Sequence, residues 1–130
     1  MSIEIFDILT FDNRITENID IVTDDPDWTE VNHFTTVSRE AGKYKITFSA
    51  IWKLATTNKS GMARYSVDGG STWKTFQSEP KDKTNDNANL FGVTVDHTGG
   101  AFDVQLDMTK EAGTSSMDCS FCEITIQRVS

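Results

Sequence analysis

The feature that most constrains the fold is residues 43–54, in which apolar and polar side chains alternate. Every even position in this stretch is apolar, and every odd position except Ile51 is polar. Successive side chains of a β-strand point to opposite faces. The alternation therefore predicts a long strand that covers a hydrophobic core with its even face and meets solvent with its odd face.

The same period recurs along the chain between clusters of Gly, Asn, Asp and Ser, which favour turns. Further strands are expected at residues 3–9, 19–23, 29–37, 62–67, 72–76, 91–95, 102–108 and 117–128. The sequence shows no sustained helical period and no internal repeat of the kind that builds propellers or solenoids. About nine short strands with such turns predict an all-β fold, an antiparallel β-sandwich of jelly-roll type.

Length and charge limit the domain organisation and the partners. The 130 residues suit one domain, in which we expect residues 1–39 to form an N-terminal arm and the first strands, and residues 40–130 to form the jelly-roll core. The net charge of −8 opposes nucleic acid, because phosphate contacts require clustered Lys and Arg. The sequence offers neither a secretory signal nor a long apolar run, so we expect a soluble protein without membrane contact.

The two cysteines, Cys119 and Cys122, fall in the last expected strand. In a regular strand they would lie about 10 Å apart on opposite faces, too far for a disulfide unless the strand breaks. We therefore expect buried thiols. The apolar residues of this strand change phase near Phe121, which predicts a β-bulge there or burial on both faces. Without a second Cys pair a zinc site lacks ligands, and we expect neither metal nor cofactor.

A short motif beginning at Ser66 matches the Asp-box of sialidase-type propellers, S-x-D-x-G-x-T-W. In those enzymes the box recurs around the propeller and lies away from the active site, whereas this chain has one copy. We interpret it as a hairpin turn in which a carboxylate accepts backbone N–H bonds and glycines allow positive φ. The residues assigned to this turn staple are Asp68, Gly69, Gly70, Thr72 and Trp73.

Other polar residues offer no recognisable chemistry. Two loops carry oxygen ligands but lack the spacing of a calcium loop, and we expect them to be solvated; they hold Asp24, Asp25 and Asp27, and Asp82, Asn85, Asp86 and Asn87. His33 and His97 are isolated, with no nucleophile or orienting group in view, so we expect no enzymatic activity. Among the tryptophans, only Trp28 is expected to be exposed for sugar stacking.

From Gly42 onward the chain resembles the small trimeric jelly-roll virion proteins of tailed bacteriophages, whose architecture is similar to complement-type and tumour-necrosis-factor-type heads. The resemblance covers about two thirds of the chain and rests on an ordered series of motifs. These are Gly42-x-Tyr44 opening a strand with Trp52, Arg64-x-x-Val67-Asp68-Gly69, Glu79-Pro80-Lys81-Asp82, and Ile124-x-Ile126-x-Arg128-Val129.

The resemblance implies a virion structural protein without enzymatic activity. We expect a capsid decoration (cement) protein, made in the host cytoplasm, that binds the major capsid protein as a homotrimer. The alternative is a tail- or fibre-associated module that binds a receptor or a carbohydrate. The candidate subunit interface comprises Ile3 and Ile5, in an edge strand able to pair across subunits, and Ile51, which is apolar on a polar face.

Overall fold

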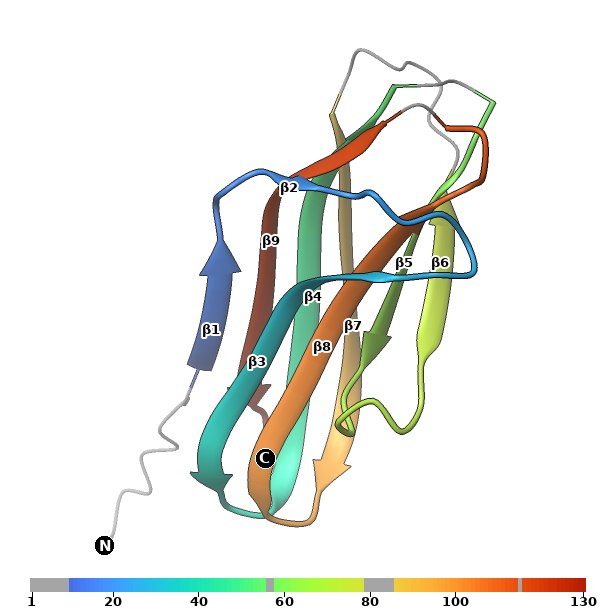
Figure 1. Ribbon diagram of the computed structural model, residues 1–130. Helices are drawn as coiled ribbons and strands as arrows, with labels where there is room; N and C mark the ends of the chain where they lie inside the picture. The colour runs from blue at the N-terminus through green and yellow to red at the C-terminus, as the bar shows by residue number, and fades with distance from the viewer. Residues whose placement is uncertain (1–9, 56–57, 79–85, 115) are drawn as a thin grey trace, which may run out of the picture.

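The computed structural model of the protein describes residues 10–55, 58–78, 86–114 and 116–130. Within them lie nine strands, and the expected strand at 3–9 falls outside. The strands form two antiparallel sheets packed face to face (Figure 1). Their bounds are β1 (Thr10–Ile15), β2 (Ile19–Asp20), β3 (Thr29–Arg39), β4 (Gly42–Leu54), β5 (Gly61–Ser66), β6 (Lys74–Ser78), β7 (Asn87–His97), β8 (Gly100–Lys110) and β9 (Met117–Arg128).

The strand pairing is nested along the sequence. Sheet A has the order β1-β9-β4-β7, with β2 also paired to β9, and sheet B has the order β3-β8-β5-β6. Thus β1 pairs with β9, β3 with β8, β4 with β7 and β5 with β6, alternately in the two sheets. Such nesting is one long antiparallel hairpin rolled onto itself. The predicted jelly roll is therefore confirmed.

The alternation in β4 sets the position of the core. The six even residues from Tyr44 to Leu54 are buried, and the odd residues of the strand are exposed or half-buried. The opposite wall of the core comes from β8, where Val104 and Leu106 are fully buried. The core lies between the sheets and includes Tyr44, Ile46, Phe48, Trp52, Leu54, Phe102, Met108, Ile124 and Ile126.

β9 contains the predicted bulge. Its register against β4 shifts by one residue between Phe121 and Cys119, which leaves Ser120 without a partner. The opposite-face arrangement of a regular strand does not apply to Cys119 and Cys122, because the extra residue turns both side chains toward the core. Both thiols are free and buried. Cys119 donates to the carbonyl oxygen of Phe121 at 3.2 Å.

Several strands begin or end one or two residues away from their expected bounds, and β7 begins four residues earlier than expected. The sequence does not predict β1, because its inward positions include Asn13, a polar residue that is satisfied by Asn32 through an amide hydrogen bond of 2.7 Å. β2 ends three residues earlier than expected. β6 begins two residues later than expected, because Thr72 is held in the preceding turn by Asp68.

The acidic loop before β3 is tied to the sandwich more firmly than its composition suggests. The ammonium of Lys110, a residue 8% exposed, pairs with the carboxylate of Asp24. The hydroxyls of Thr23 and Thr29 are 2.8 Å apart across the base of the loop. The carboxylate of Asp24 is solvent-exposed, as predicted, and it also serves as the counter-ion that the buried ammonium of Lys110 needs.

Phe48→Asp is expected to lower the free energy of unfolding by more than about 4 kcal/mol, since it places an unpaired charge where Phe48 is fully buried. Lys45→Asp, on the exposed face of the same strand, should change it by less than about 0.5 kcal/mol. Urea denaturation of both variants measures the difference. Equal destabilisation by the two substitutions would show that the register of β4 is wrong.

Candidate functional site

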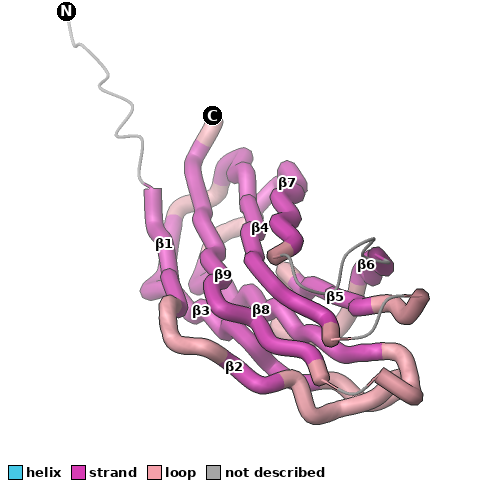
Figure 2. The backbone as a smooth tube through the Cα atoms, turned by 90° about the horizontal axis from the view of Figure 1, so that it is seen from above, coloured by secondary structure: helices cyan, strands magenta, loops and turns pink. Residues whose placement is uncertain are grey.

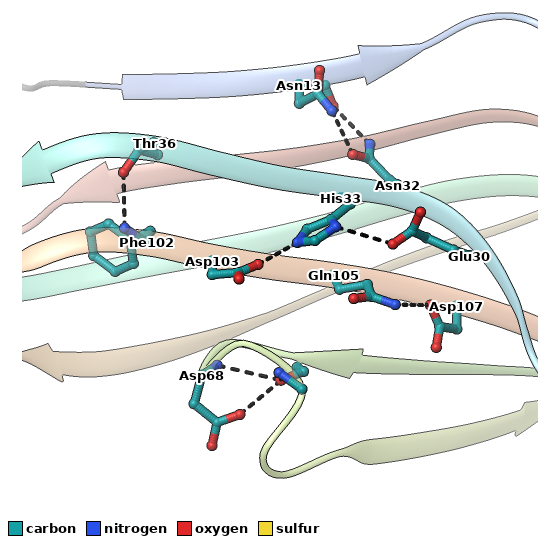
Figure 3. A network of polar contacts seen from close by, with 12 residues as sticks. Asn13, Glu30, Asn32, His33, Thr36, Asp68, Phe102, Asp103, Gln105 and Asp107 are labelled. Carbon is teal, nitrogen blue, oxygen red and sulfur yellow. Dashed lines mark hydrogen bonds and ion pairs between the residues drawn. The ribbon is translucent and has the colours of Figure 1, made fainter.

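The outer face of sheet B carries a network of charged side chains (Figure 3). The Nε2 atom of His33 contacts the carboxylate of Asp103, and its Nδ1 lies 3.1 Å from Glu30. The hydrogen bond that His33 donates to Asp103 and the charges of both carboxylates raise the pKa of His33, although desolvation opposes the shift. Because both ring nitrogens are engaged, the ring is held as an ion-pair partner. His97 instead stacks on the core residue Phe102, with ring centroids 3.9 Å apart.

Beside this network, Arg64 is held between two tryptophans. Its guanidinium carbon lies 3.9 Å from the ring centroid of Trp73 and 4.7 Å from that of Trp28. Its Nε donates to the buried carboxylate of Asp107 at 2.9 Å, and Gln105 donates to the other oxygen of Asp107. The expectation of an exposed Trp28 is wrong, because Arg64 covers its ring and leaves the residue half-buried.

The Asp68 turn closes the β5–β6 hairpin, the innermost pair of the roll. The carboxylate of Asp68 accepts from the backbone N–H and the hydroxyl of Thr72, at 2.9 and 2.5 Å. The hydroxyl of Ser66 donates to the same carboxylate and accepts from the N–H of Gly70, both at 2.8 Å. Gly69 and Gly70 have φ of 72° and 89°, a region that favours glycine.

These hydrogen bonds stabilise the ionised form of the carboxyl group. The hydroxyl and backbone N–H of Thr72, followed by the hydroxyl of Ser66, lower the pKa of Asp68 from 3.8 to about 2. Trp73 packs against the turn, with its ring edge 3.5 Å from the position that a Cβ on Gly70 would occupy. Every assigned residue of the motif thus takes part in the turn, and its carboxylate is occupied by its own chain.

Ile51 lies in an apolar row on the outer face of sheet A. It is directly opposite Phe121 on β9 and Ala88 on β7, and all three point away from the core. Leu90, two residues further along β7, faces the same side and is 76% exposed. We name these four residues the apolar patch. Ile3 and Ile5, the other candidate interface residues, lie outside the described residues.

A groove opens between the sheets on the side where β6 faces β7, and the sequence analysis missed it. It has a volume of about 350 Å³. The floor is apolar, and the indole N–H of Trp52 donates to the side-chain oxygen of Asn89 at its rim. At one end Phe76 packs against Phe91 with ring centroids 4.4 Å apart and the ring planes tilted by 35°. The sequence signal for the groove is weak and consists of Gly61. A Cβ at this position would come within 2.9 Å of the indole of Trp52, so glycine leaves the space beside that ring open.

The two loops with candidate calcium ligands are described only in part. Asp24 is paired with Lys110, and Asp82 and Asn85 lie outside the described residues. Asp86 lies 3.9 Å from the ammonium of Lys53. In the part of the chain that the structure describes, no three His, Cys, Asp or Glu side chains are grouped to hold a metal ion. The same part contains no helix long and apolar enough to cross a membrane.

No protein-family model and no curated protein sequence matches the chain. Solved structures match it in fold. VP2 of an infectious bursal disease virus subviral particle superimposes with a TM-score of 0.58 at 9% identity, over 92% of this chain and 32% of that one. A chain of the infectious bursal disease virus Gt strain gives 0.55 at 9%, over 93% and 33%. A carbohydrate-binding module of Cellvibrio mixtus lichenase 5A, in complex with cellotriose, gives 0.43 at 14%, over 95% and 98%.

At these identities the likeness shows the fold alone. The chain has the jelly-roll fold of proteins from a virus particle, and it spans about a third of the length of the two viral chains.

Asp68→Ala is expected to lower the melting temperature by several degrees, because it removes the acceptor that closes the turn. Since folding lowers the pKa of Asp68, the ionised carboxylate stabilises the folded protein fully when the pH is above 3.8, the ordinary pKa of the group. This stabilisation is lost as the pH falls through about 2. Thermal melts should therefore converge for native and variant protein as the pH falls through this range. Ser71→Ala, in the same turn, is the control. Release of sialic acid by the native protein, abolished in Asp68→Ala, would overturn the structural interpretation.

Proposed function

We propose that the protein is a bacteriophage virion protein that decorates the capsid: a homotrimer that sits on the major capsid protein and stabilises the head. The observation that carries the proposal is the apolar patch on the outer face of sheet A. The jelly-roll fold shared with virus-particle proteins supports a structural role in a virion. The motifs from Gly42 onward, which resemble trimeric phage proteins, support the finer assignment.

The apolar patch has the composition of an interface core. Ile51, Phe121 and Ala88 form one continuous row across three strands, and Leu90 extends it along β7. Polar side chains surround the row, with Ser49 and Glu123 on one side and Lys53 and Asp118 on the other. Protein interfaces commonly combine an apolar centre with a polar rim and bury about 800 Å² per partner. We therefore assign this face to a contact between subunits or with the capsid.

The charge distribution agrees with a protein that coats a particle. The net charge of −8 repels other acidic surfaces and keeps coated particles apart. The charged side chains of the outer face of sheet B, such as Glu30 and Asp103, are about half exposed and suit a solvent-facing surface. In this arrangement sheet A meets partners and sheet B meets solvent.

The second candidate is a tail- or fibre-associated module that binds a receptor or a carbohydrate. The observation in its favour is the pair of tryptophans beside Arg64, Asp107 and Gln105, because sugar sites combine aromatic faces with polar groups. Arg64 already stacks on both rings, which leaves less aromatic face for a sugar. A glycan-binding assay that detects a ligand, lost in Trp73→Ala, would favour this alternative.

Light scattering on the purified protein should give about three times 14.5 kDa. Leu90→Asp, in the apolar patch, should reduce the mass to that of a monomer because it places a charge in the interface core. Thr75→Asp, on the outer face of sheet B, should leave the trimer intact.

Virions without the protein should release DNA at a lower temperature. A monomer located at the tail, with heads of unchanged stability in its absence, would contradict the proposal.

A further inference from the structure

We infer that the groove between β6 and β7 receives residues 3–8 of a second copy of this chain, which add a strand to the β7 edge and place Ile3 and Ile5 in the groove. The inference deepens the homotrimer proposed above and rests on it. It assigns each subunit a donor segment and an acceptor groove.

The two sides of the sandwich are closed differently (Figure 2). On one side β1 and β3 are joined by Asn13 and Asn32: the Asn13 side chain donates to the Asn32 side-chain oxygen at 2.7 Å, and the Asn32 side chain donates to the backbone carbonyl oxygen of Asn13 at 3.0 Å. Arg39 also covers the ring of Phe11 there, 3.7 Å from its centroid. On the other side β6 and β7 meet through the contact between the rings of Phe76 and Phe91, beyond which the groove opens between the sheets. This second side is therefore where the core of the sandwich remains accessible.

The groove has the chemistry of a site for aliphatic side chains. Its floor is formed by Trp52, Leu106 and Met108, which are buried core residues. At the rim, Phe76 is 41% and Leu90 76% exposed, so large apolar surfaces face solvent at its mouth. The volume of about 350 Å³ exceeds that of a single aliphatic side chain and falls at the lower end of ligand pockets, about 300–1,000 Å³.

The backbone beside the groove can accept a strand. Among the described residues, β7 pairs with β4 on one side and with no strand on the other. An edge strand presents free N–H and C=O groups, and an extended segment can pair with them while its alternate side chains fill adjacent pockets. Asn89 and Phe91, alternate residues of β7, both line the groove. A strand added to β7 therefore points every second side chain toward the groove.

The N-terminal segment matches this site in pattern. Ile3 and Ile5 are alternate residues separated by Glu4, so a strand can direct both isoleucines inward and the carboxylate outward. Both β-branched residues favour extended backbone. In the same strand Phe6 and Ile8 would fall on the outward side with Glu4, beside Leu90 of β7, and Asp7 would fall on the inward side after Ile5.

The same copy cannot supply the segment. Ile5 can lie at most about 17 Å from Thr10, the first described residue, because an extended chain spans about 3.4 Å per residue. Thr10 pairs with β9 at the level of Thr94 of β7. A strand paired with the free edge of β7 lies four strand spacings across from Thr10, and its residue level with Asn89 is also five residues along, which is about 26 Å from Thr10 in the plane of the sheet. The occupant therefore comes from a neighbouring subunit.

Passing the segment from each subunit to the next is a head-to-tail contact, because the donor and acceptor surfaces differ. Such contacts close into a ring when the rotation between subunits permits. Donor and acceptor lie on opposite edges of sheet A, at β1 and β7. A ring of three subunits would use every groove and leave no free segment.

The test uses two variants of the full chain. Ile5→Asp has a defective segment and an intact groove, and Phe76→Asp has an intact segment and a defective groove. Each alone should give a threefold lower mass than the native trimer by light scattering. Their equimolar mixture should form a dimer, since one functional segment and one functional groove remain. Glu4→Lys, on the outward side of the segment, should remain a trimer. If Phe76→Asp does not fold, Asn89→Lys replaces it, because it blocks the rim and not the core.

Three results would overturn the inference. The first is a trimer for both defective variants, which leaves the homotrimer standing without this contact. The second is a mixture that stays monomeric. The third applies if the native chain is a monomer, a result that contradicts the proposed homotrimer. In that case a peptide of residues 1–10 is added to the Ile5→Asp protein at millimolar concentration. If the peptide does not quench the tryptophan fluorescence of the protein, the groove is excluded as its binding site as well. Saturable quenching by this peptide, lost when its Ile5 is replaced by Asp, would support the groove.

Discussion

The pairing of β4 with β9 in sheet A is the constraint on which the rest of the structure depends. It brings together the two strands with the longest apolar faces, and residues such as Phe48 and Ile124 lie side by side in the core. The pairing holds along the full length of β4 only because β9 absorbs an extra residue at Ser120. Without the bulge, the part of β9 before Ser120 would turn Met117 and Cys119 to solvent. One inserted residue thus keeps the core continuous.

The nested topology determines where the Asp68 turn, the groove and the two outer faces lie relative to the β4–β9 pair. Because the chain is a rolled hairpin, its tip is the β5–β6 turn, where Asp68 fixes the chain reversal. The same topology leaves β6 and β7 as neighbouring edges in different sheets, and the groove lies between them. The two outer faces then differ in chemistry. Sheet A presents the apolar patch, whereas sheet B presents ion pairs such as Arg64 with Asp107. The molecule therefore offers surfaces for association.

Sequence reasoning recovered the parts of the fold that depend on local pattern. The alternation in β4 and the phase change near Phe121 follow directly from side-chain geometry, and both led to correct predictions. β1 escaped detection because its inward Asn13 is satisfied only by Asn32, a partner 19 residues away. The error about Trp28 has the same origin, since Arg64, which covers it, is distant in sequence. The groove could not be predicted, because it is formed by the distance between two edge strands and not by any one segment.

The central claim is that other subunits bind this jelly roll along the free edge of β7 and on the adjoining outer face of sheet A. Amide hydrogen exchange of the full chain, followed by mass spectrometry at dilute and at concentrated protein, tests it most directly. The account predicts that exchange in β7 slows at least tenfold on concentration, because its free edge gains hydrogen-bond partners, while exchange in β3 is unchanged. Exchange in β7 that is the same at every concentration would contradict the account.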